Sequence, residues 1–272
     1  MSQKESNAYI LGTELAELHR LGLQHQVWAE EACKGWDLAG FTDGQTLLDL
    51  GCGPGYCTTE LAFIVGNRGR VYGVDKSQLY IDFLQKIVKL YKLPITLYCS
   101  DFDSMKIAAN KLNGIYSRWA LAWVPNPEVI IAKLYKSLVR GGTIVAHEYF
   151  DWSTLQTEPS KPALAKAIAA ALQSLKDQPG NIDIGRKLPG FFENAGFEII
   201  STRPMTKMAS PTQLAWNWPK SFFNIYFPKL ISSGYLTKRE VRDALYEFDQ
   251  LENEPGATIL CPHMREVIAR KP

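Results

Sequence analysis

Three glycines on alternate positions make residues 49–55 (DLGCGPG) a segment whose residue types and spacing point to ligand binding. Glycine-rich loops of this kind often bind phosphates. The dinucleotide-binding loop requires G-x-G-x-x-G, because its third glycine lets the following helix pack closely on the strand. Here the spacing is G-x-G-x-G with Tyr56 next, and no Lys follows as a P-loop requires. Since neither phosphate signature is present, the glycines are expected to let the backbone approach a flat or extended ligand.

Two acidic residues follow this loop at the ends of the next apolar runs. Asp75 stands 20 residues after Gly55 and ends the run 70–74, and Asp101 follows the run 95–99. At the end of a second strand, a carboxylate can accept both hydroxyls of a ribose and repel a 2′-phosphate. One strand further along, a carboxylate can accept a hydrogen bond from an adenine amino group. Asp75 can also be the N-cap of the next helix, which is compatible with ribose binding.

The pattern of apolar runs predicts the sheet that brings these residues together. Short apolar strands alternate with helical stretches, which indicates right-handed βαβ units and parallel strands covered on both faces. The runs are near-continuous rather than alternating, as in strands buried on both faces. The predicted strands are 46–50, 70–74, 95–99, 112–119 and 141–150, and the helices between them are 56–65, 77–91 and 128–138.

Further helices are predicted before and after this alternating region. A helix over 13–34 has Thr13 as its N-cap, and Gly35 then breaks it. The later elements are helices over 159–176 and 185–195, a strand over 196–208, an aromatic-rich helical insertion over 212–252 and a last strand over 257–270, antiparallel to the strand before it. No linker is visible, so we expect a single domain over 1–272. In it, the N-terminal helix (about 9–36) and the inserted helices (about 151–195 and 212–252) form a cap over the active site.

Composition narrows the class of protein. The chain has 272 residues, 21% of them charged, a net charge of +2 and no long basic run, so no nucleic-acid partner is expected. Its five cysteines form no CxxC pair, and no His/Asp/Glu spacing suggests a metal site. The N-terminus lacks a signal-peptide pattern and no apolar stretch is long enough to span a membrane. We therefore expect a cytoplasmic protein with reduced thiols, no bound metal and no membrane partner.

Taken together, the loop 49–55, the two acids and a fifth strand introduced by Gly-Gly resemble the class I S-adenosylmethionine-dependent methyltransferases of the small-molecule, methyltransferase-11/25-like type. The resemblance covers about residues 9–150, and the later strands fit the same topology. It implies a doubly wound, mostly parallel seven-stranded sheet of the Rossmann-like α/β class, with the last strand antiparallel and a helical cap. It also implies S-adenosyl-L-methionine as the cofactor.

The resemblance also assigns cofactor contacts. In that family the glycine loop surrounds the methionine and ribose parts of the cofactor, the acid here numbered Asp75 takes the ribose hydroxyls, and Asp101 with Phe102 faces the adenine. A helix near the N-terminus closes over the cofactor carboxylate, and the backbone at the end of the fourth strand lies by the methionyl group. The implied cofactor-binding residues are Tyr9, Arg20, Gln24, Asp49, Gly51, Gly53, Gly55, Asp75, Lys76, Asp101, Phe102, Arg118 and Trp119. Asp49 can alternatively cap its turn, and a polar helix face also explains Arg20 and Gln24.

Methyl transfer from a sulfonium is an in-line displacement with a good leaving group, so alignment and exclusion of water supply much of the catalysis. A general base is needed only if the acceptor must lose a proton early. Candidates for that catalytic role lie near the end of the fifth strand: His147 could deprotonate a hydroxyl and Glu148 could orient an amine. Strand alternation can instead point His147 into a packed interior.

The acceptor must be inferred from the aromatic residues of the cap. They indicate a small, partly hydrophobic or aromatic molecule; the candidates are Trp119, Trp123, Trp152, Trp216, Trp218, Phe222, Phe223 and Tyr226. An (N/D)PPY segment, typical of enzymes that methylate exocyclic DNA amines, does not follow the fourth strand. We expect a monomer or homodimer. Two alternatives stay open: an NAD(P)-dependent oxidoreductase, and a non-catalytic module or partner subunit that binds S-adenosylmethionine.

Overall fold

The computed structural model describes residues 15–106, 108 and 110–272, so the predicted positions Tyr9 and Thr13 lie outside the described residues. None of the helices in these ranges is long and apolar enough to cross a membrane.

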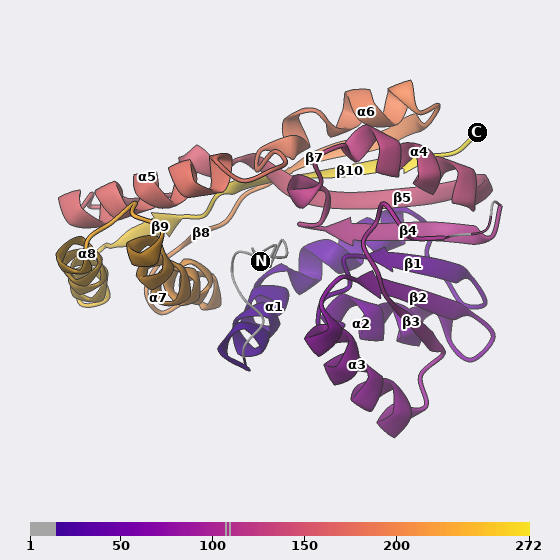
Figure 1. Cartoon of the computed structure of the whole chain (residues 1–272), viewed down its shortest axis with the longest axis horizontal. Coiled ribbons are helices and arrows are strands. Elements are labelled where there is room, and N and C mark those ends of the chain that lie inside the picture. Colours follow the sequence, from indigo (N-terminus) through magenta and orange to yellow (C-terminus); the bar gives the residue numbers. More distant parts are fainter. Residues whose placement is uncertain (1–14, 107, 109) are drawn as a thin grey trace, which may run out of the picture.

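A seven-stranded sheet forms the centre of the molecule (Figure 1). Its strand order is β3-β2-β1-β4-β5-β10-β7, and only β10 runs antiparallel to its neighbours. The strands are β1 (Thr46–Leu50), β2 (Arg70–Asp75), β3 (Ile95–Cys99), β4 (Leu112–Arg118), β5 (Leu138–Asp151), β7 (Glu198–Met205) and β10 (His263–Arg270). The predicted Rossmann-like sheet with an antiparallel last strand is therefore confirmed.

Helices cover both faces of this sheet. On one face, α1, α2 and α3 pack against side chains such as Leu47 and Val145, and on the other, α4 and α6 pack against side chains such as Leu48 and Ile144. Neighbouring residues of one strand thus point into different apolar cores, which explains the near-continuous apolar runs. The helices are α1 (Leu15–Leu38), α2 (Tyr56–Val65), α3 (Gln78–Tyr91), α4 (Pro127–Ser137) and α6 (Leu188–Asn194).

Helix α1 continues through Gly35 to Leu38, so the predicted break at Gly35 is wrong. A Cβ atom on Gly35 would lie 2.5 Å from Glu266 Oε2 and 3.1 Å from Val145 Cγ1. The glycine is therefore needed for close packing of the helix on the sheet and does not end the helix.

A second group of elements extends the molecule beyond β5, β10 and β7 (Figure 1). Its apolar core packs residues such as Trp216, Phe223 and Phe248 together. The group comprises α5 (Pro162–Lys176), α7 (Asn217–Ser232), α8 (Lys238–Leu251) and a three-stranded sheet in the order β6 (Gln156–Glu158), β9 (Thr258–Leu260), β8 (Met208–Ala209).

This small sheet was not predicted, because two expected strands are each divided. The expected strand 196–208 separates into β7 and β8, and the expected strand 257–270 separates into β9 and β10. The chain leaves β7 at Met205 and re-enters the large sheet in β10, where Met264 is paired with Met205. The excursion between them carries β8, α7, α8 and β9.

Candidate active site

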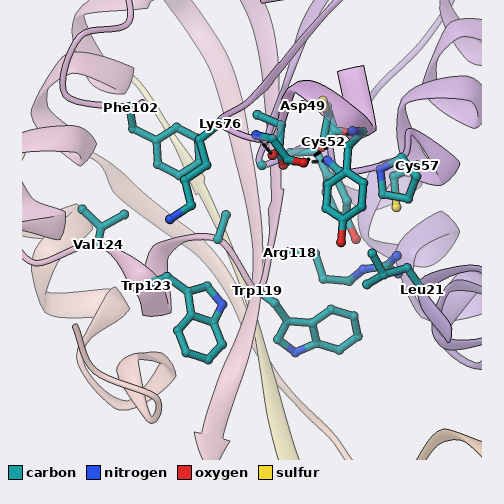
Figure 2. A pocket seen from close by; sticks show the side chains of 18 of the residues that line it. Leu21, Asp49, Cys52, Cys57, Lys76, Phe102, Arg118, Trp119, Trp123 and Val124 are labelled. Atoms are coloured by element: carbon teal, nitrogen blue, oxygen red, sulfur yellow. Dashed lines mark hydrogen bonds between the residues drawn. The ribbon is translucent and has the colours of Figure 1, made fainter. Parts of the chain in front are cut away.

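A cavity of about 1210 Å³, counting its open mouth, lies at the carboxyl ends of β1, β2, β3 and β4. We call it the first cavity. In Figure 2, Asp49, Lys76 and Phe102 lie along one side of it and Trp119 and Trp123 along the other. The predicted residues that line it are Gln24, Asp49, Gly51, Gly53, Asp75, Lys76, Asp101, Phe102, Arg118 and Trp119.

The glycine loop uses its three glycines in different ways, and all three have positive φ. At Gly53 a Cβ atom would meet nothing within 4 Å, so this position leaves open space in the cavity. At Gly51 a Cβ atom would lie 2.5 Å from Ala120 Cβ, because the loop after β4 comes very close. Gly55 is the N-cap of α2 and faces Leu84 rather than the cavity. Gly55 therefore allows close packing against Leu84, and it does not line the first cavity as was predicted.

Asp75 is held rigidly at the end of β2. Its Oδ2 accepts a hydrogen bond from the Gly53 backbone N–H at 2.9 Å, and its Oδ1 accepts one from the Ser77 N–H at 2.8 Å. Burial raises the pKa of this carboxyl above its ordinary value, and the two N–H groups oppose that shift. Asp75 therefore orients the glycine loop and is fixed beside the open space at Gly53.

Asp49 lies deeper in the same cavity. It accepts a hydrogen bond from the Thr58 hydroxyl at 2.6 Å, and burial raises its pKa to about 6. The hydroxyl belongs to α2, so Asp49 joins the end of β1 to the following helix.

The Arg118 side chain enters the first cavity, where only its backbone was predicted to matter. One terminal nitrogen, NH2, lies 3.1 Å from His25 Nδ1, and His25 Nε2 lies 3.0 Å from Glu60 Oε1. Since a guanidinium only donates, His25 Nδ1 must accept, which leaves the proton on Nε2 facing Glu60. The other nitrogen, NH1, is buried and has no hydrogen-bond partner among the described residues. The cavity therefore contains a cation that still has a donor to offer.

Sequence reasoning missed His25 and Glu60. They lie on α1 and α2, and 93 residues separate His25 from Arg118. No local spacing links residues so far apart, so no sequence signal could have found this contact.

Arg20 and Gln24 lie at a second cavity of about 550 Å³, counting its mouth. Arg20 donates to Glu17 at 2.6 and 2.7 Å and to Gln24 Oε1 at 2.8 Å. The second cavity shares Gln24, Trp119 and Trp123 with the first, whereas Arg20 lines only the second. Of these two predicted carboxylate ligands, the structure therefore brings only Gln24 to the first cavity.

Trp119 stands between the two cavities in an unusual backbone conformation. Its φ is 53°, in the left-handed region that bulky residues rarely adopt. Its N–H donates to the His147 carbonyl at 3.0 Å, and the next two N–H groups, of Ala120 and Leu121, donate to Glu148 Oε1 at 3.0 and 2.8 Å. Burial raises the pKa of Glu148 to about 8.

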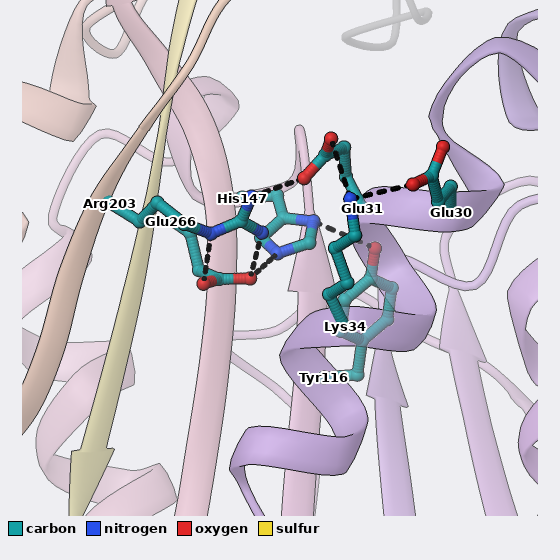
Figure 3. A network of polar contacts seen from close by, with 7 residues as sticks. All are labelled: Glu30, Glu31, Lys34, Tyr116, His147, Arg203 and Glu266. Atoms are coloured by element: carbon teal, nitrogen blue, oxygen red, sulfur yellow. Dashed lines mark hydrogen bonds and ion pairs between the residues drawn. The ribbon is translucent and has the colours of Figure 1, made fainter.

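His147 and Glu148 are fully buried, and neither lines the first cavity or the second. His147 Nε2 lies 2.8 Å from Glu266 Oε2, and its Nδ1 lies 3.2 Å from the Tyr116 hydroxyl. As Figure 3 shows, Arg203 joins Glu266 to Glu31 of α1 and completes a network across the sheet. The predicted roles, His147 as a base and Glu148 as a group that orients an amine, are thus not supported, because neither side chain lines the first or the second cavity.

Comparison with known proteins agrees with this arrangement. Residues 47–142, from β1 into the first part of β5, match the family model described as a methyltransferase domain. A protein of 37.1 kDa from a Streptomyces fradiae transposon, with no assigned function, is 27% identical over 201 residues, covering 71% of this chain and 57% of that protein. The sterol 24-C-methyltransferase of Saccharomyces cerevisiae is 26% identical over 185 residues, covering 66% of this chain and 46% of that enzyme. The chain thus spans about half the length of these curated relatives.

Among solved structures, the geranyl diphosphate C-methyltransferase of Streptomyces coelicolor, in complex with S-adenosyl-L-homocysteine, shares the fold with a TM-score of 0.59. The two are 13% identical, and the alignment covers 91% of this chain and 77% of that one. Residues 47–142 therefore belong to the methyltransferase domain family, and the chain as a whole has the fold of a class I S-adenosylmethionine-dependent methyltransferase.

Proposed function

We propose that this chain binds S-adenosyl-L-methionine in the first cavity and transfers its methyl group to a small, partly hydrophobic or aromatic acceptor by in-line displacement. The observation that carries the proposal is the pairing of two groups in one cavity. Asp75 is fixed as an acceptor beside the open space at Gly53, and Arg118 NH1 is a buried donor without a described partner. These groups suit the two polar parts of the cofactor, its ribose diol and its amino-acid carboxylate.

The other lining residues fit the rest of the cofactor. Asp101 and Phe102 lie on the same cavity and would contact the adenine, as a carboxylate that accepts from the amino group and a ring that stacks on the base. Gly53 leaves room for the backbone to approach the ligand closely. Arg118 would hold the carboxylate with NH1 while His25 keeps NH2 in place.

When bound, the cofactor supplies a sulfonium-linked methyl group whose S–C bonding pair stays on sulfur as the acceptor's lone pair forms the new bond to carbon. The residues of this chain contribute orientation and exclusion of water. Trp119 and Trp123 wall the side of the first cavity that adjoins the second. No histidine is among the described residues that line either cavity, so we propose alignment rather than a histidine base as the main contribution.

An apolar acceptor is supported by the aromatic lining and by the sterol methyltransferase relative, which acts on an apolar molecule. The expected cytoplasmic location and the monomer or homodimer stay predictions from the sequence.

Calorimetric titration tests the cofactor assignment. Wild-type protein should bind S-adenosylhomocysteine, and Asp75→Ala should weaken that binding by about 10- to 100-fold, because a hydrogen bond to a charged group contributes about 1.5–3 kcal/mol. Asp82→Asn, at an exposed position of α3 outside the cavity, is the control and should bind as the wild type does. Binding of NAD without S-adenosylhomocysteine would instead favour an oxidoreductase.

A second measurement separates an enzyme from a module that only binds the cofactor. Transfer of a tritiated methyl group from S-adenosylmethionine to a panel of apolar amines, phenols, thiols and alkenes should label at least one compound. Arg118→Met should lower both cofactor affinity and labelling, because it removes the cation without removing bulk. Labelling that persists unchanged in Arg118→Met would remove Arg118 from the site.

A further inference from the structure

The second cavity adjoins the first along Gln24, Trp119 and Trp123, and the rest of its wall includes Leu175 of α5 and Phe222 of α7. A molecule in the second cavity would therefore lie against the tryptophan side of the first. The inference rests on the proposed function, and the walls of this cavity specify what kind of acceptor fits.

The charge of the side chains that line the second cavity, among the described residues, is neutralised by an ion pair. Arg20 is the only charged side chain among the described residues that line the second cavity, and Glu17 binds its guanidinium through both carboxylate oxygens, at 2.6 and 2.7 Å. Both side chains are almost fully buried, at 3% and 2% exposure. An anionic ligand would have to compete with Glu17, and a cationic one would find no carboxylate on the described wall. Because an unpaired charge is costly to bury, the cavity favours an uncharged ligand.

Aromatic faces form a large part of this wall. The rings of Tyr149 and Trp218 are parallel within 4° with centroids 6.5 Å apart, and Trp119 lies 5.7 Å from Trp218 at 30°. The indole N–H groups of these two tryptophans are already engaged, that of Trp218 with Gln24 Oε1 at 2.8 Å and that of Trp119 with the Met264 sulfur at 3.0 Å. The rings therefore present apolar faces to the cavity, which favours a flat, apolar molecule.

Gln24 supplies one directional polar group at the shared edge. Its Oε1 accepts from Arg20 NH1 and from Trp218 Nε1, both at 2.8 Å. Because both partners can only donate, the amide orientation is fixed and Nε2 is left as a donor. No described residue accepts from that Nε2, although Gln24 is almost fully buried at 7% exposure and lines both cavities.

We propose that the second cavity binds the methyl acceptor, and that it selects an uncharged, flat and mostly apolar molecule carrying one hydrogen-bond acceptor for the Gln24 amide. Leu175, Ile182 and Phe222 define the apolar end of the site, and Gln24 defines its polar end next to the methyl donor.

Three related probes test the charge and the polar contact. Ligand-observed NMR titrations on protein saturated with S-adenosylhomocysteine would use 1-naphthol, naphthalene and naphthalene-1-sulfonate. We expect 1-naphthol to bind about tenfold more tightly than the sulfonate, which must bury a charge. Gln24→Leu removes the Nε2 donor and also the oxygen that accepts from Arg20 and Trp218, so its effect is measured as a ratio of affinities. The preference for 1-naphthol over naphthalene should fall about five- to tenfold in this variant. Equal binding of the sulfonate, or an unchanged preference of Gln24→Leu for 1-naphthol over naphthalene, would overturn the assignment.

Two variants that fill the apolar end of the second cavity test where 1-naphthol binds. Leu175→Phe and Ile182→Phe add side-chain volume there, away from the first cavity. Each variant that keeps a wild-type melting temperature should bind 1-naphthol about tenfold or more weakly. Their affinity for S-adenosylhomocysteine, measured by calorimetry, should stay within about twofold. If both variants unfold, Phe222→Ala tests the same wall by enlargement, and unchanged 1-naphthol binding would place the probe elsewhere.

The two proposals fail separately in this design. Protein that binds S-adenosylhomocysteine but shows none of the expected differences refutes the acceptor site alone. Protein that binds no S-adenosylhomocysteine refutes the proposed function, and the acceptor site with it.

Discussion

Trp119 adopts a left-handed backbone conformation that costs a residue with a Cβ atom about 1–2 kcal/mol. The conformation is maintained by hydrogen bonds on both sides, from its own N–H to the His147 carbonyl and from the next two N–H groups to Glu148. Strain that the surroundings hold in place is common at ligand sites. Here it directs the indole to the boundary of two cavities.

The strain at Trp119 can be measured with two truncations. Trp119→Gly and Trp119→Ala both remove the indole, but only glycine adopts positive φ without a steric penalty. We expect Trp119→Gly to be more stable than Trp119→Ala by about 1 kcal/mol in urea denaturation, because the strain is relieved in one variant and kept in the other. An alanine variant at least as stable as the glycine variant would show that the backbone relaxes.

Glu148 makes stability depend on pH. Its pKa rises from 4.5 to about 8 in the folded protein because of burial, so between these values the folded state holds a proton that the unfolded state has lost. The contribution of Glu148 to the free energy of unfolding is therefore fully present below about pH 4.5 and is lost as the pH rises through about 8. Asp49, with a pKa raised to about 6, acts in the same direction over a lower range.

Glu148→Gln isolates this contribution. The amide keeps an oxygen for the Ala120 and Leu121 N–H groups but cannot titrate. The difference in unfolding free energy between wild type and Glu148→Gln should therefore shrink or reverse as the pH rises from 4.5 to 8, in guanidinium melts at several pH values. Glu193→Gln, at an exposed position of α6, is the control and should show no such trend.

At the scale of elements, the packing of α1 on the sheet depends on Gly35. In most helix interiors, Gly→Ala stabilises by up to about 1 kcal/mol. A Cβ atom at position 35 would lie 2.5 Å from the buried carboxylate of Glu266, which His147 and Arg203 hold in place.

Gly35→Ala should therefore destabilise the protein by about 1–3 kcal/mol, as overpacking does. Gly190→Ala, within α6, is a matched control because a Cβ atom there meets nothing within 4 Å, and it should be neutral or stabilising. Thermal unfolding of the two variants checks this, and similar melting temperatures would mean that α1 shifts without cost.

At the scale of the molecule, sequence reasoning predicted the large sheet and most of the first cavity. The strands are short apolar runs, and residues at their carboxyl ends meet at one edge of a parallel sheet, so Asp75 and Asp101 could be placed together without coordinates. The side-chain role of Arg118 could not be predicted, because it depends on His25, which only the folded packing of α1 brings near. For His147 the sequence left two alternatives, a base at the site or a side chain in the packed interior, and the structure places it in the interior.

The pairing of Met205 with Met264 has a consequence for how such a chain can evolve. Residues 206–262 leave the large sheet after β7 and return to it at β10, which is paired with β7, and insertions between such neighbouring points are tolerated by a stable domain. This excursion supplies Trp218, Pro219, Phe222 and Pro262 to the second cavity, whereas every described residue lining the first falls between positions 21 and 125. Recombination at the two ends of this excursion could therefore replace part of the lining of the second cavity, the proposed acceptor site, while the segment that lines the first cavity stays unchanged.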